Sequence, residues 1–121
     1  MRIFKNKWFA RFARKEAISD ESLQEAVKRI EAGNYDADLG AGVFKQRIAR
    51  PEAGHSGGYR VILCLKLETR AFFVYGFAKS DRANIAQDEA REFKKLAKIL
   101  FTMTDEQLEL MLQSRDFDEL P

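Results

Sequence analysis

Two apolar runs separated by three residues place the strongest constraint on the fold of this chain. The runs, Tyr59–Leu67 and Ala71–Phe77, are rich in aliphatic and aromatic residues, and residues 68–70 between them have the length of a hairpin connection. A third run, Val43–Ala49, precedes them across a loop of Pro, Gly and Ser residues that is too long for a tight hairpin. The pattern predicts an antiparallel meander of three strands.

Helical periodicity precedes this meander. An edge strand is expected at residues 2–4, and residues 7–17 then place aromatic and alanine side chains at helical spacing. Ser19 is a predicted N-cap for a second helix, which Gly33 would end. Residues 34–42 are expected to form a loop that leads into the first strand of the meander.

Two further helices are expected after the meander. Asn84 is the predicted cap of the first, and Thr104 with Gln107 has the spacing of a capping box for a shorter last helix. The predicted fold class is α+β, with an N-terminal helical hairpin packed on a small antiparallel sheet and followed by C-terminal helices. We expect one domain over residues 1–121, with a helical extension from about residue 104 whose role is packing.

Composition excludes several classes of protein. The chain is 45% hydrophobic and 33% charged, which is the balance of a folded soluble domain, and no stretch has the length of an apolar membrane span. The single cysteine, Cys64, lies inside an apolar run, so it is expected to be a small core residue. No spacing of His, Cys, Asp or Glu suggests a metal site, and the sequence predicts a cytoplasmic protein without a cofactor.

Charge is unevenly distributed along the chain, although the net charge is only +2. Residues 1–15 carry six cations and no acids, residues 16–40 carry two cations and seven acids, and residues 83–121 carry five cations and nine acids. The middle block, residues 41–82, carries eight cations and three acids. Such a local excess indicates either a site for a polyanion or a solvated basic face.

Several cations of the middle block are expected to meet on the sheet. Lys45 and Arg47 project from one face of their strand because side chains alternate, and Arg60 follows a glycine pair at the start of the next strand. Lys79 and Arg82 end the third strand. A cluster of this kind can bind phosphate and stabilise the extra negative charge of phosphoryl transfer. Lys45 or Lys79 would then serve as general acid or base.

Other residues with chemical potential have simpler interpretations. His55 lies in the glycine-rich loop and is either an exposed loop residue or a substrate contact. Trp8, Phe9 and Phe12 could stack on bases, but a stripe with helical spacing is typical of a core face. The glycine pattern of the loop matches neither a P-loop nor a dinucleotide-binding turn.

Three strings of the sequence stand out together: FKQRIARP, SGGYRVILCL and FFVYGFAKSDRANI. With them the chain resembles the RelE/ParE superfamily of bacterial toxins from toxin–antitoxin pairs. The resemblance is to the subgroup with KQR-(I/V)-A-R-P, a glycine-rich loop, SGGYR and a VYGFAKS-(E/D)-RANI ending, and it covers about residues 1–100.

The resemblance implies a RelE-type endoribonuclease that cuts messenger RNA, commonly in the ribosomal A site, by attack of a ribose 2′-hydroxyl on the adjacent phosphate. No metal is used. Carried over motif by motif, Lys45 would be proton acceptor or electrostatic activator, Arg47 and Arg60 would stabilise the phosphorane, and Lys79 would contact the leaving group or a phosphate. The substrate-binding residues would be Arg50, His55, Tyr59, Tyr75 and Arg82.

One position departs from the RelE pattern, in which a tyrosine often follows the last basic segment. No tyrosine follows Tyr75 in this chain, since Ile85 and Ala86 occupy that stretch. The role of the missing tyrosine would then be vacant or fall to Tyr75, Tyr59 or His55.

Superfamily resemblance leaves three functions open, because one fold hosts several activities. The leading one is the mRNA endoribonuclease, with mRNA and the ribosome as partners. The others are a ParE-like inhibitor of DNA gyrase without a catalytic centre and a degenerate nucleic-acid-binding module. Retention of the four basic positions favours RNA, and the missing tyrosine argues against catalysis. In each toxin case a cognate antitoxin is implied, and the two proteins would together repress their operon by binding operator DNA.

Overall fold

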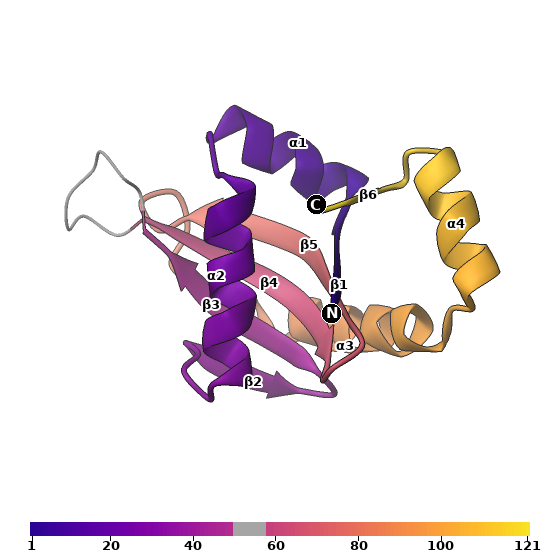
Figure 1. The fold of residues 1–121 in the computed structure, drawn as a ribbon. Helices are drawn as coiled ribbons and strands as arrows, with labels where there is room; N and C mark the ends of the chain where they lie inside the picture. The colour runs from indigo at the N-terminus through magenta and orange to yellow at the C-terminus, as the bar shows by residue number, and fades with distance from the viewer. Residues whose placement is uncertain (50–57) are drawn as a thin grey trace.

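The chain folds around one six-stranded sheet with strand order β2-β3-β4-β5-β1-β6 (Figure 1). The computed structural model describes residues 1–49 and 58–121. The strands are β1 (Arg2–Asn6), β2 (Ala37–Gly40), β3 (Val43–Ile48), β4 (Tyr59–Lys66), β5 (Arg70–Ala78) and β6 (Phe117–Glu119). The helices are α1 (Lys7–Lys15), α2 (Asp20–Glu31), α3 (Gln87–Thr102) and α4 (Asp105–Gln113). The predicted α+β class is confirmed.

Helices cover both faces of the sheet. The α1–α2 hairpin packs on one face, and its buried core includes Phe9, Leu23, Val27, Leu63 and Phe73. Helices α3 and α4 contribute to the core on the other face, which includes Phe4, Ile62, Phe72, Leu100 and Leu108. Arg70 at the start of β5 donates to the carbonyl oxygens of Leu100 and Met103, so it satisfies backbone groups at the C-terminal end of α3.

The predicted meander of β3, β4 and β5 is confirmed, with antiparallel pairing throughout. The β4–β5 register shifts once, because Ile62 pairs with Tyr75 whereas Leu63 pairs with Phe73, which leaves Val74 as an extra residue in β5. A bulge of this kind interrupts the alternation of side chains. As a result Tyr75 packs against the core on the α3 face, as Val74 does.

Two strands were not expected, and the strand expected at residues 2–4 is present but does not lie at the edge of the sheet. β1 is internal: it pairs in parallel with β5 and antiparallel with β6. Part of the expected loop at residues 34–42 is β2, which pairs with β3. Both additional strands are short. β2 forms a hairpin with the adjacent β3, and β6 pairs with the distant β1, where Phe117 packs against Phe4 and Phe72.

Helix termini follow the expected capping chemistry at two of three sites. Ser19 accepts the N–H of Ser22 at the start of α2, and Thr104 with Gln107 forms the predicted capping box of α4. The expectation for Asn84 is wrong, because α3 begins at Gln87 with Ala86 as the N-cap residue. The first helix ends at Lys15, two residues earlier than predicted.

The surroundings of Gly42, which precedes β3, show how tightly the sheet packs on α3. Gly42 adopts φ +80°, and a Cβ there would lie 2.6 Å from Cε2 of Phe101 and 3.0 Å from the carbonyl oxygen of Leu65. Gly33 has a similar φ of +82° but would place its Cβ in open space. We expect Gly33→Ala to lower the free energy of unfolding by about 1 kcal/mol, and Gly42→Ala by roughly 1–3 kcal/mol more.

Urea unfolding of both variants beside the unchanged chain measures this difference. Equal losses for the two variants would show that Phe101 moves aside at little cost and that α3 packs loosely on this corner of the sheet.

Candidate functional site

The basic side chains of β3 and β4 lie on the face of the sheet that carries α3. Residues Gln46 and Ile48 are buried on the α2 side of β3, so strand alternation directs Lys45 and Arg47 to the other face. Arg60 alternates with Tyr59 and Val61, which belong to the α1–α2 core, so it shares that face. The predicted grouping of these cations is therefore reproduced by the fold.

Arg47 and Arg60 are direct cross-strand partners in the β3–β4 pair. Like charges opposite each other destabilise a sheet, so this pairing has a cost in the unliganded chain. An anion between them would remove the repulsion, and a guanidinium can hold two phosphate oxygens at once. The pair is therefore suited to binding phosphate.

An aspartate that precedes β2 bridges two of these cations. Oδ2 of Asp36 lies 3.3 Å from Nε of Arg60 and 3.6 Å from Nζ of Lys45. The Arg60 and Lys45 side chains are only 13% and 17% exposed, whereas Asp36 is 33% exposed. The carboxylate therefore sits at the solvent side of a partly buried pair of cations.

Asn84 and Arg82 extend this group toward α3. Nζ of Lys45 donates to Oδ1 of Asn84 at 3.2 Å, and Nε of Arg82 donates to the Asn84 carbonyl oxygen at 2.8 Å. Arg82 also donates to the Tyr75 hydroxyl at 2.9 Å and pairs with Glu89. We use the term cationic cluster for Lys45, Arg47, Arg60 and Arg82.

Glu89 holds Arg82 in place. The hydrogen bond from Arg82, together with the backbone N–H of Ala86, lowers the pKa of the Glu89 carboxyl. The hydrogen bond to Glu89 in turn raises the pKa of Arg82. Both groups are thus charged over the physiological range. The cluster is partly neutralised by two acids, Asp36 and Glu89, that come from outside the basic block of the sequence.

Tyr75 joins the cationic cluster to a row of aromatic rings. Its ring stacks on Trp8 with centroids 4.7 Å apart and lies 5.8 Å from Phe93, while the Arg82 guanidinium lies 5.8 Å from its centroid. Trp8 is 42% exposed, unlike Phe9, which is buried. The expectation of a core stripe therefore applies to Phe9 and, in part, to Phe12, whereas Trp8 sits at the surface beside Tyr75.

The remaining predicted site residues are not brought into the cluster. Tyr59 is 4% exposed in the core on the opposite face, where its hydroxyl donates to Oε1 of Glu16 at 2.9 Å. Lys79 is exposed one residue beyond β5, and its backbone N–H donates to Gly58. Arg50 and His55 lie outside the described residues.

Three residues of the site were missed from the sequence: Asp36, Asn84 and Glu89. The string RANI contains Asn84, but the sequence pattern predicts a helix cap there and does not indicate the contact with Lys45. Nothing near Asp36 or Glu89 in sequence indicates a partner on β3 or after β5. The expected role of Cys64 as a core residue is consistent with its full burial, which raises the pKa of its thiol to about 12.

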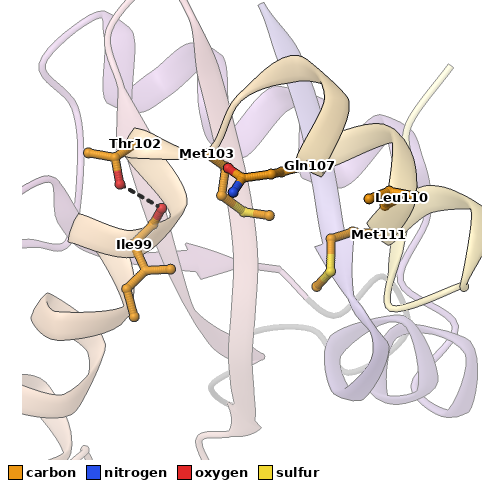
Figure 2. Close-up of a pocket in the computed structure, with 6 residues that line it drawn as sticks. All are labelled: Ile99, Thr102, Met103, Gln107, Leu110 and Met111. Atoms are coloured by element: carbon orange, nitrogen blue, oxygen red, sulfur yellow. Dashed lines mark hydrogen bonds between the residues drawn. The ribbon is translucent and has the colours of Figure 1, made fainter.

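No group of three or more potential metal ligands occurs within residues 1–49 and 58–121. In the same part of the chain, no helix is long and apolar enough to cross a membrane. A cavity of about 440 Å³ lies between α3 and α4, away from the cationic cluster, and Figure 2 shows its largely apolar lining. It is lined by Ile99, Thr102, Met103, Gln107, Leu110 and Met111.

Comparison with known families agrees with this geometry. The family described as the RelE toxin of the RelE/RelB toxin–antitoxin system matches residues 1–120. The match thus extends beyond the motif strings and includes α4 and β6. No curated protein matches the chain. The chain belongs to the RelE toxin family, the toxin components of toxin–antitoxin systems that have an antitoxin as partner.

Proposed function

We propose that this toxin is a metal-independent endoribonuclease that acts in the cytoplasm, cuts messenger RNA on the ribosome and so inhibits translation. The observation that carries the proposal is the convergence of Lys45, Arg47, Arg60 and Arg82 on one face of the sheet. A toxin that only bound another protein would have no need of several cations gathered on one face of the sheet.

Each cation has a role in this reaction. Attack of a ribose 2′-hydroxyl on the neighbouring phosphate passes through a phosphorane with additional negative charge. Arg47 and Arg60 would bind its oxygens, because preorganised donors aimed at developing charge are a large source of rate enhancement. Lys45 would act close to the reacting oxygens, and Lys79, at the end of β5, would contact a flanking phosphate.

Tyr75 and Trp8 would supply the aromatic surface that the missing late tyrosine provides elsewhere in the superfamily. Tyr75 contacts Arg82 directly and Trp8 is exposed at its side. Base–aromatic stacking contributes about 1–3 kcal/mol per base and tolerates any sequence. We expect these two rings to hold a base next to the scissile phosphate.

A cell-free translation reaction tests the proposal. Purified toxin is added, and the 5′ ends of the message are mapped by primer extension, with naked RNA alongside. We expect new ends within the codon in the ribosomal A site, unchanged when EDTA is added to polyamine-stabilised ribosomes. Loss of cleavage in EDTA would contradict the metal-free mechanism.

Intact translation and intact message at high toxin concentration would contradict the nuclease altogether. A DNA supercoiling assay with gyrase would then test the alternative that the toxin is a protein inhibitor of the ParE kind.

A further inference from the structure

Lys45 is poorly placed to accept a proton, although the sequence suggested that role. Its Nζ donates to Oδ1 of Asn84 at 3.2 Å and faces Oδ2 of Asp36 at 3.6 Å. Both neighbours are hydrogen-bond acceptors, and the protonated ammonium has three donors and no acceptor. The position suits a lysine that gives a proton rather than one that takes it.

Asp36 is the acceptor inside the same cluster. Its Oδ2 is held between Lys45 and Arg60. Within the described part of the chain its other oxygen, Oδ1, has no hydrogen-bond partner, and the side chain is 33% exposed. One carboxylate oxygen is thus held by two cations, while a third of the side-chain surface is open to solvent.

We propose that Asp36 is the general base that takes the proton of the ribose 2′-hydroxyl, a role that rests on the proposed function. The proton passes from O2′ to Oδ1 of Asp36 as the O2′–P bond forms and the P–O5′ bond breaks. Lys45 gives its proton to the departing O5′. The products are a 2′,3′-cyclic phosphate and a 5′-hydroxyl, and no water is consumed.

Asp36 and Lys45 must regain their starting protonation states before the next reaction. After cleavage Asp36 carries a proton and Lys45 is neutral, and the two groups are separated by 3.6 Å in the resting chain. Loss of the carboxylic-acid proton to solvent and uptake of a proton from solvent by the amine restore both starting charges. Arg60 keeps the carboxylate in position through Nε and carries positive charge toward the phosphorane.

Asp36→Asn tests this role, because the amide keeps the shape and a hydrogen-bond acceptor for Arg60 but cannot take the proton. On ribosomes programmed with a synthetic message, we expect the single-turnover cleavage rate to fall by about 100-fold or more. Binding of the variant to the same ribosomes should be unchanged. The control is Asp38→Asn, two residues along, whose carboxylate accepts the N–H of Gly40 instead.

The pH profile separates catalysis from a structural effect. The charged groups that face Asp36 are Lys45 from β3 and Arg60 from β4. The pH–rate profile of cleavage by the unchanged toxin should show a limb that the profile of Asp36→Asn lacks. A message with sulfur in place of the scissile O5′ needs no proton on its leaving group, so it should restore cleavage by Lys45→Met but not by Asp36→Asn.

Three results would overturn the proposal. Full cleavage by Asp36→Asn would show that the carboxylate takes no part in the reaction, and the proposed nuclease function would be unaffected. Faster cleavage by the variant, with tighter binding, would make Asp36 a counter-ion that restrains the cluster. Absence of cleavage by the unchanged toxin would instead contradict the proposed function, and with it any base.

Discussion

Arg60→Ala is expected to lower the rate of message cleavage by about 100- to 1,000-fold, the usual loss when one donor to a charged transition state is removed. Arg60 faces Arg47 across the β3–β4 pair and holds Asp36 through Nε at 3.3 Å. In the proposed reaction its loss removes a phosphorane contact and one of the two cations that hold Asp36. Primer extension over a time course, with toxin in excess over programmed ribosomes, measures the rate.

Arg60→Lys separates charge from geometry, because lysine keeps the positive charge but not the planar fork of donors. We expect it to recover little of the lost activity. Arg91→Ala, an exposed arginine on α3, is the matched control and should cleave normally. Since the Arg60 side chain is only 13% exposed, thermal unfolding of each variant must accompany the rates. A folded Arg60→Ala that cleaves normally would exclude this arginine from the reaction.

Phe117→Ala is expected to produce the largest loss of stability, about 3–5 kcal/mol in the free energy of unfolding. Phe117 is 6% exposed, and its ring lies 5.5 Å from that of Phe72 and 6.2 Å from that of Phe4. Its removal leaves a cavity beside two buried rings and weakens the attachment of β6 to β1. A loss of this size is a large fraction of the total stability of an ordinary domain.

Denaturant unfolding at equilibrium measures the effect, and Leu110→Ala provides the control from the same C-terminal segment. Leu110 is 64% exposed on α4, so its truncation should change stability by no more than about 0.5 kcal/mol. Equal stability of Phe117→Ala and the unchanged chain would show that β6 is dispensable for the sheet.

Local features of the fold could be predicted from the sequence. The β4–β5 hairpin has its strands and its turn within one stretch of chain, and the Thr104 capping box is formed by residues three apart. Of the two unpredicted strands, β2 also forms a local hairpin, with a two-residue turn at Ala41 and Gly42, whereas β6 pairs with a strand from the other end of the chain. β6 is three residues long, and its Phe117 packs against Phe72 and against Phe4, which lies near the other end of the chain.

In the candidate site, too, some positions could be predicted from the sequence and others could not. Alternation along one strand places Lys45 with Arg47, and the antiparallel pairing of β3 with β4 places Arg60 opposite Arg47. The ion pair between Asp36 and Lys45 could not be predicted from the sequence, because it depends on the pairing of the unexpected strand β2 with β3. The position of Tyr75 depends on a bulge in β5, and no residue pattern marked that irregularity.

The pairing of β1 sets an order in which the chain can fold. This strand is made before both of its neighbours, β5 and β6, whereas β3, β4 and β5 follow one another along the chain. Contacts between distant segments form more slowly than local ones. We expect refolding to show a fast phase as the hairpins form and a slower phase as β1 docks. Until β1 docks, Phe4 and Phe72 lack their stacking partner, so the incompletely folded chain exposes apolar surface through which it can aggregate.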